Sequence, residues 1–279
     1  MVNDKVKHVL GLSGGKDSSA LAVYMRDNFP ELEIEYFFTD TGAELDEVYE
    51  YLNELEGYLG KTINYLEPER GFTTYLEQHG NFLPSAQARW CTVKLKLLPF
   101  EKWVQKDFLD NGFTVNSYVA IRADENFREG LQSKKDIDTI LPFRDNHIDK
   151  QGVIEILENS GLGLPKYYDW RSRSGCTFCF FQRKIEWVGL LERHPKEFEK
   201  AKKMEKTSLK DGSPFTWSQG ESLEELQRPE RIAQIKSDHA RKLESAKSKQ
   251  KINPLRPDEG YVDFDELYGQ QKVCLACHK

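Results

Sequence analysis

The sequence has no long apolar run, few cysteines and no surplus of positive charge. None of its apolar stretches approaches the ~20 residues of a membrane-spanning helix, so no membrane partner is expected. The polar residues 1–7 lead straight into an apolar stretch and do not resemble a secretion signal, so we expect a cytoplasmic protein. A formal net charge of −6 argues against a protein coated in nucleic acid, although a local basic face is compatible with it.

Cysteine is scarce but grouped. The five cysteines are Cys91, Cys176, Cys179, Cys274 and Cys277. Without a secretion signal, disulfides are not expected. Four of the five form two Cys-x-x-Cys pairs, which in a cytosolic chain favour metal binding or redox chemistry.

The first 125 residues alternate between strand-like and helix-like segments. Strands are predicted over residues 6–12, 34–39, 63–66 and 115–122, and helices over residues 18–29, 46–59, 72–79 and 95–110. This alternation predicts an α/β fold with a doubly wound, mostly parallel sheet covered by helices on both faces. Ligands of such sheets bind beyond the carboxyl ends of the strands. After residue 145 the pattern predicts helices over residues 150–160, 181–193, 195–206 and 223–248, which form a helical C-terminal extension.

Residues 11–19 read Gly-Leu-Ser-Gly-Gly-Lys-Asp-Ser-Ser and lie between the first predicted strand and the first predicted helix. Small residues let the chain curl so that several backbone N–H groups point at one anion, and the helix N-terminus adds a partial positive charge. Lys16 adds a full charge, whereas Asp17 suits a phosphate site only if a metal ion bridges the two. The loop is not a Walker A motif, because Leu10 stands where that motif has its first glycine.

The string Ser13 to Ser18 resembles the pyrophosphate-binding loop of the PP-loop ATP pyrophosphatase superfamily, whose members split ATP between the α and β phosphates. Two later stretches, which begin at Asp40 and Ala120, resemble motifs of its phosphoadenylyl-sulfate (PAPS) reductase family. In the second of them Ala120 and Asn126 replace the family's glycine and serine. The resemblance implies an adenine nucleotide alpha hydrolase-like fold. It assigns a nucleotide site to Ser13, Gly14, Gly15, Lys16, Asp17, Ser18, Asp40, Thr41, Gly42, Arg122 and Arg128.

The order of the cysteines is similar to that of the iron–sulfur branch of this family. That branch includes adenylyl-sulfate reductases and the sulfurtransferase subunit of the DNA phosphorothioation system. The resemblance implies a 4Fe-4S cluster held by Cys91, Cys176 and Cys179, with Cys274 as the fourth ligand. Trp90 stands where adenylyl-sulfate reductases have a second adjacent cysteine. The fourth position is therefore also compatible with Cys277 or with an open site for a sulfur atom.

The C-terminal Cys277-His278 leaves other interpretations open. Cys277 is a candidate catalytic nucleophile, because sulfonucleotide reductases end in a loosely similar Cys-Gly-x-His tail. Alternatively, a structural Zn²⁺ is held by Cys176, Cys179, Cys274 and Cys277. The zinc interpretation leaves Cys91 without a role, and we favour the cluster.

The intact loop implies pyrophosphate as a product, and hence ATP with Mg²⁺ as the substrate. The resemblance then implies an ATP-dependent sulfurtransferase. In it Lys16 stabilises the leaving pyrophosphate, Asp17 helps to hold Mg²⁺, and sulfur replaces an adenylated oxygen of an acceptor such as nucleic acid. The alternatives are a sulfonucleotide reductase that uses Cys277 and a non-catalytic nucleotide- and metal-binding subunit of a modification or defence complex. The partners considered are ATP, a sulfur donor such as a cysteine desulfurase, a nucleic-acid substrate and a second copy of the chain.

We expect three regions along the chain. Residues 1–145 form the PP-loop nucleotide-binding domain, and residues 146–206 form a helical Cys-x-x-Cys region packed on it. Residues 207–279 form a helical and extended tail that ends in Cys-x-x-Cys-His. The Lys-rich run over residues 236–251 is interpreted as a solvated helix face, with an electrostatic binding surface for a polyanion as the less favoured alternative.

Overall fold

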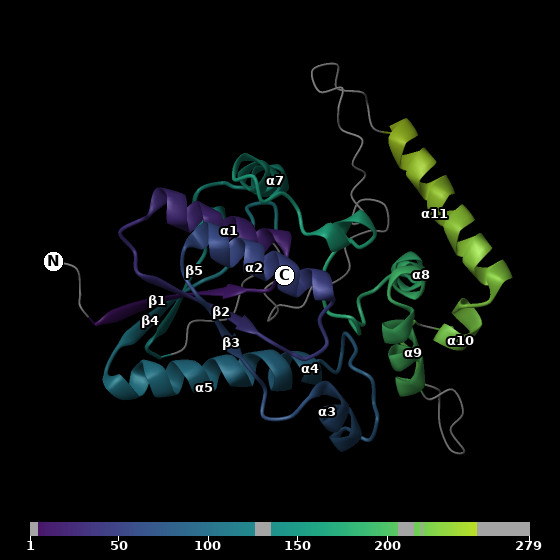
Figure 1. Cartoon of the computed structure of the whole chain (residues 1–279), viewed down its shortest axis with the longest axis horizontal. Coiled ribbons are helices and arrows are strands. Elements are labelled where there is room, and N and C mark those ends of the chain that lie inside the picture. The colour runs from purple at the N-terminus through teal and green to yellow at the C-terminus, as the bar shows by residue number, and fades with distance from the viewer. Residues whose placement is uncertain (1–4, 126–134, 206–214, 219, 250–279) are drawn as a thin grey trace.

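A parallel β-sheet forms the centre of the protein (Figure 1). The computed structural model describes residues 5–125, 135–205, 215–218 and 220–249. Its five strands are hydrogen-bonded in the order β3-β2-β1-β4-β5, and every pairing is parallel. The strands are β1 (Val6–Leu12), β2 (Ile34–Thr39), β3 (Ile63–Leu66), β4 (Thr114–Tyr118) and β5 (Ile137–Ile140). The predicted doubly wound α/β fold is confirmed, although β5 was not among the predicted strands.

Helices cover both faces of the sheet. Figure 1 shows α1 (Lys16–Asn28), α2 (Asp46–Leu59) and α7 (Lys150–Asn159) on one face and α5 (Leu98–Asp107) on the other. Side chains alternate along the strands, so that Leu10 packs into the larger core under α1 and α2, whereas Val9 joins the smaller core with Val104 of α5. Both sheet faces are therefore buried, as expected for parallel strands.

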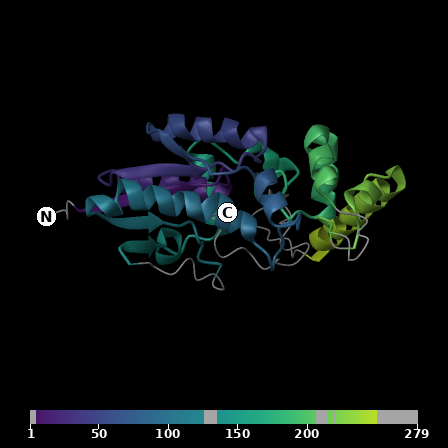
Figure 2. The same ribbon diagram turned by 90° about the horizontal axis from the view of Figure 1, so that it is seen from below.

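The remaining helices lie around the ends of the strands, and those of the C-terminal part gather at one end of the molecule (Figures 1 and 2). They include α3 (Phe72–Gln78), α4 (Trp90–Thr92), the π-helical turn η1 (Val93–Leu97), α6 (Pro142–Asp145), and the 3₁₀ turns η2 (Leu109–Asn111) and η3 (Lys166–Asp169). The C-terminal helices are α8 (Lys184–Arg193), α9 (Pro195–Met204), α10 (Leu223–Leu226) and α11 (Pro229–Lys249). They confirm the helical extension, whereas the proposed regional boundaries stay a prediction. Within the described ranges, no helix combines the length and the apolar character needed to cross a bilayer.

Two predicted helices have different bounds. The helix predicted over residues 223–248 is divided into α10 and α11, because Pro229 lacks an amide donor and begins a new helix. The helix predicted from residue 181 begins only at Lys184. Its N-cap Arg183 is extended, and the Glu186 side chain accepts a hydrogen bond from the Arg183 amide at 2.7 Å.

The order of the strands reverses at β1. The chain moves from β1 to β2 on one side, whereas β4 pairs with β1 on the other side. In doubly wound sheets this switch point is where ligands bind, outside the carboxyl ends of the two strands. The loop that follows β1 and the segment that follows β4 both begin at this position.

Candidate functional site

The glycine-rich loop connects β1 to α1 at the switch point. Gly14 has φ +64°, which favours glycine, and a Cβ atom at this position would lie 2.5 Å from Cγ1 of Val48 on α2. The Ser18 hydroxyl closes the loop, since it accepts a hydrogen bond from the Ser13 amide at 3.1 Å and donates one to the Gly15 carbonyl at 3.2 Å. The N-cap residue Gly15 has no side chain that competes for the first amides of α1, which suits an anion site.

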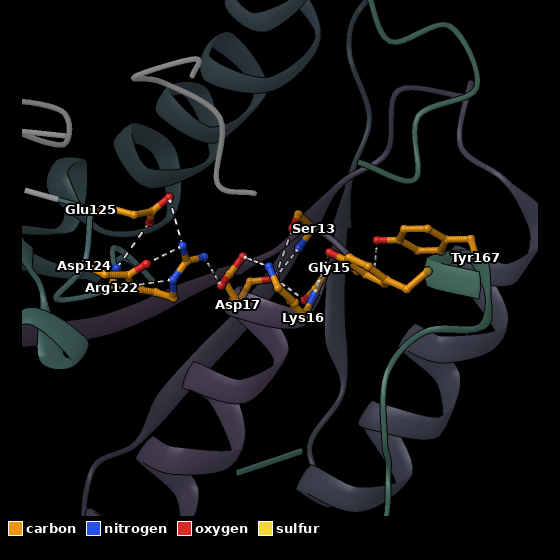
Figure 3. Close-up of polar contacts among 11 residues, drawn as sticks. Ser13, Gly15, Lys16, Asp17, Arg122, Asp124, Glu125 and Tyr167 are labelled. Atoms are coloured by element: carbon orange, nitrogen blue, oxygen red, sulfur yellow. Dashed lines mark hydrogen bonds and ion pairs between the residues drawn. The ribbon is translucent and has the colours of Figure 1, made fainter. Parts of the chain in front are cut away.

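Asp17 lies between two cations (Figure 3). Lys16 Nζ and Arg122 Nη1 each lie 2.9 Å from a different oxygen of the Asp17 carboxylate, and all three side chains are buried. Lys16 and Asp17 begin α1, whereas Arg122 follows β4. The ion pairs therefore join the two sides of the switch point.

Arg122 also binds two further carboxylates, as Figure 3 shows. Its Nε and Nη2 atoms donate to the two Asp124 oxygens at 2.9 and 3.0 Å, and its amide donates to Glu125 at 3.3 Å. With Lys16 and Asp17 the group holds two positive and three negative charges, and Arg144, whose Nη2 atom donates to the Glu125 carbonyl at 3.2 Å, adds a third positive charge. The partly exposed Asp124 carboxylate is the kind of oxygen ligand that Mg²⁺ takes.

The ion pairs keep these groups charged. Burial alone would lower the pKa of Lys16, but the Asp17 carboxylate raises that pKa above its ordinary value. Burial likewise acts against the charge of Arg122, yet Asp17, Asp124 and Glu125 raise its pKa. Burial would raise the pKa of Asp124, but its hydrogen bonds with Arg122 lower it.

The motif Asp40-Thr41-Gly42 follows β2, the strand next to β1. Asp40 Oδ1 accepts hydrogen bonds from the Gly42 amide at 2.8 Å and from the Tyr49 hydroxyl at 2.7 Å. The Thr41 hydroxyl donates to Glu44 at 2.9 Å. The structure thus brings the motif to the same sheet edge as the glycine-rich loop, where these contacts stabilise a tight turn.

The first Cys-x-x-Cys pair forms a turn, in which the Cys179 amide donates to the Cys176 carbonyl at 3.3 Å. The fully buried Arg171 guanidinium donates to the carbonyls of Ser174 and Cys176 at 3.0 Å and of Thr177 at 3.4 Å. Backbone hydrogen bonds also join the turn to the segment after β2. The Leu45 amide donates to the Gly175 carbonyl at 2.9 Å, and the Thr177 amide donates to the Ala43 carbonyl at 2.7 Å.

The third predicted cysteine ligand lies on another segment. Cys91 belongs to α4, and Lys96, in the π-helical turn that follows, lies close enough to Cys176 to act on its thiol. Burial, Glu44 and Cys179 raise the pKa of the Cys176 thiol, while Lys96 opposes them. Among the described residues, no three His, Cys, Asp or Glu side chains are grouped so as to hold a metal ion. Arg128, Cys274 and Cys277 lie outside the described residues.

Two tyrosines of η3 reach the loop without any signal in the sequence. The Tyr167 hydroxyl donates to the Gly14 carbonyl at 3.0 Å, and the Lys16 amide donates to the Tyr168 hydroxyl at 3.3 Å. Lys16 Nζ also lies 5.6 Å from the centre of the Tyr168 ring. The Lys16 amide therefore already has a protein hydroxyl as its acceptor. Through these hydrogen bonds, η3 links the loop to the segment that contains Cys176.

Comparison with known proteins identifies a family and several relatives. Residues 7–139 match the family described as phosphoadenosine phosphosulfate reductase domain. An uncharacterized protein of Methanocaldococcus jannaschii is 26% identical over 205 residues, which are 71% of this chain and 41% of that protein. An uncharacterized nin region protein of Escherichia phage lambda is 24% identical over 212 residues, which are 66% of this chain and 68% of that protein. The chain therefore spans about two fifths of the archaeal relative and two thirds of the phage relative.

Solved structures of low sequence identity are also similar to the chain. The phosphate complex of PAPS reductase from Candida auris gives a TM-score of 0.44 at 13% identity, over 61% of this chain and 79% of that one. The U34-tRNA thiolase NcsA from Methanococcus maripaludis, with its 4Fe-4S cluster, gives 0.41 at 16% identity, over 70% of this chain and 68% of that one.

Proposed function

Because residues 7–139 form a domain of the phosphoadenosine phosphosulfate reductase family, we propose that the chain is an ATP-dependent sulfurtransferase of the PP-loop type. The observation that supports this most is the loop at the end of β1, where a glycine curl, a helix N-terminus and the buried, charged Lys16 meet. These groups suit the two linked phosphates of a departing pyrophosphate.

In the first step an acceptor oxygen attacks the α-phosphorus of ATP. The bond from this phosphorus to the α–β bridging oxygen breaks, and pyrophosphate leaves with the electron pair. Lys16, the amides at the start of α1 and Arg122 stabilise the charge that develops on it. The carboxylate oxygens of Asp17 and Asp124 suit Mg²⁺, which these residues would hold and which neutralises phosphate charge when bound.

In the second step sulfur replaces the activated oxygen. A sulfide attacks the acceptor carbon that carries the adenylated oxygen, and AMP leaves with that oxygen. If the donor is a cysteine persulfide, its terminal sulfur forms the new bond to this carbon, and a second cysteine thiol then attacks the donor sulfur, so that the thiolated acceptor leaves and a disulfide remains. We propose a cysteine desulfurase as the sulfur donor. The Cys176–Cys179 turn, whose carbonyls Arg171 fixes, suits cluster ligands. With Cys91 and Cys274 these thiols would hold a 4Fe-4S cluster, which supplies an iron position for sulfur; a Zn²⁺ site with Cys277 in place of Cys91 is the alternative.

The products of ATP cleavage test this proposal. ATP labelled at the α-phosphate, incubated with candidate acceptors, is expected to yield AMP and pyrophosphate. Lys16→Ala is expected to abolish the reaction, whereas Lys61→Ala, at an exposed position after α2, leaves it unchanged. ADP and phosphate as products contradict the mechanism.

Two other experimental results would favour a function different from ATP-dependent sulfur transfer. Sulfite released from PAPS or adenylyl sulfate, and lost in Cys277→Ser, would establish a sulfonucleotide reductase instead. ATP binding without turnover, in the presence of every candidate acceptor, would favour a non-catalytic subunit.

A further inference from the structure

A cavity of about 1000 Å³ lies apart from the glycine-rich loop. Its walls come from residues 82–88, residues 180–185, the segment around Trp217 and residues 231–242 of α11. Among the described residues that line it, none belongs to the loop, to the Asp40 motif or to the Arg122 group. It is therefore a second candidate binding site.

Aromatic rings line this cavity. Phe82, at 52% exposure, is one of the most exposed large apolar side chains described, and its ring centre lies 4.2 Å from that of Phe215. The ring of Phe181 lies 5.6 Å from the Arg89 guanidinium and 5.7 Å from that of Arg173. Exposed rings backed by guanidinium groups are surfaces on which nucleobases stack, because every base has a π-face.

Positive charge accompanies the rings. The charged lining residues are Arg183, Lys184, Arg231, Lys242 and one carboxylate, Asp238. Lys184 and Arg231 share one further carboxylate, Glu221, at 2.6 and 3.0 Å, and Asp238 pairs with Arg241. Burial is the main cause that lowers the pKa of His239; Lys242 and Arg183 add to this effect, whereas Glu186 opposes it. Aromatic rings with surplus cations complement a chain of bases and phosphates.

The cavity also adjoins both described cysteine segments. Two residues separate residues 82–88 from Cys91, and one of them, Trp90, donates a hydrogen bond from its indole to the Phe82 carbonyl at 3.0 Å. Residues 180–185 follow Cys179 without a gap. A ligand in the cavity therefore lies against the two segments that carry the candidate cluster ligands.

We propose that this cavity binds single-stranded nucleic acid, with bases on Phe82 and Phe181 and phosphates along Lys184 and Lys242. The idea that the bound strand is the sulfur acceptor rests on the proposed sulfurtransferase function, and it names the substrate class of that function. Binding of the strand to the cavity does not itself require ATP.

Fluorescence anisotropy with a labelled oligothymidylate of about 12 nucleotides, within the site sizes of strand-binding grooves, tests the proposal without ATP. Phe82→Ala is expected to weaken binding about tenfold, the typical loss of one stacked base. The matched control Tyr65→Ala, an aromatic residue 43% exposed on β3, is expected to change it by less than about twofold. Lys242→Ala is expected to lower the salt dependence of binding, whereas Lys200→Ala, exposed on α9, leaves it unchanged. Thermal melting verifies that each variant is folded.

Equal affinities of Phe82→Ala and Tyr65→Ala, or no binding of the oligonucleotide, overturn the proposal. Free AMP that displaces the probe at the same concentration as unlabelled oligonucleotide also overturns it, because the cavity would then be a mononucleotide site. Lys16→Ala is expected to bind the probe normally. Loss of ATP cleavage with retained strand binding thus separates failure of the proposed function from failure of this inference.

Discussion

Gly14→Ala tests whether the curl of the loop depends on the absence of a side chain. A residue other than glycine at φ +64° costs roughly 1–2 kcal/mol. The added methyl group would lie 2.5 Å from Val48 Cγ1, and Val48 also packs against the backbone of Gly175 on its other side. Overpacking of this kind costs about 1–3 kcal/mol, so we expect a total loss of about 2–5 kcal/mol in the free energy of unfolding.

Urea unfolding followed by tryptophan fluorescence measures this loss. Val48→Ala removes the obstructing methyl groups, so the double variant Gly14→Ala/Val48→Ala is expected to lose about 1–3 kcal/mol less than the sum of the two single losses. A Gly14→Ala protein as stable as the wild type, or strictly additive losses, would show that a side chain at position 14 does not collide with Val48.

The remaining predictions concern charge, the cysteine turn and pH. Asp17→Asn leaves two buried cations without their shared partner, so thermal melting is expected to show a loss of about 3–5 kcal/mol, partly restored by pyrophosphate; an unchanged melting temperature would contradict it. Arg171→Met removes the donor shared by three carbonyls, so we expect faster labelling of Cys176 by a thiol reagent, and an unaltered rate would show that Arg171 does not hold the turn. Burial raises the pKa of Tyr36 from 10.0 to about 12, so the unfolded chain ionises first and stability is lost as pH rises from about 10 to 12. Unfolding of Tyr36→Phe is expected to depend less on pH in this window, and parallel profiles would exclude Tyr36 as a cause.

The sheet and the loop were predictable because they depend on local signals. Apolar runs fix the buried strands, and Gly14 with Lys16 marks the turn into α1. The order of the strands was not predictable in detail. The strand β5 was missed because it is short and half-buried and contains Asp138, which weakens its apolar pattern. The fold class therefore followed from the sequence, whereas the position of the switch point required the structure.

The contacts that join the two halves of the site were not predictable. Tyr167 and Tyr168 reach the loop from more than a hundred residues away, and no periodicity marks them. Val48 is visible as part of a helical apolar stripe, but its position between Gly14 and Gly175 depends on tertiary packing. Asp17 was predicted as a metal ligand; its ion pair with Arg122 appears only once β1 and β4 are neighbours.

The proposed function requires that the loop after β1 binds pyrophosphate. Isothermal titration of pyrophosphate into the protein, with and without Mg²⁺, measures this binding. We expect binding that Mg²⁺ strengthens, because the ion would join pyrophosphate to the carboxylates of Asp17 and Asp124, and a loss of at least about tenfold in the affinity of Lys16→Ala, as for other charge-assisted contacts. Pyrophosphate that does not bind, or that binds Lys16→Ala as tightly as the wild type, would contradict it.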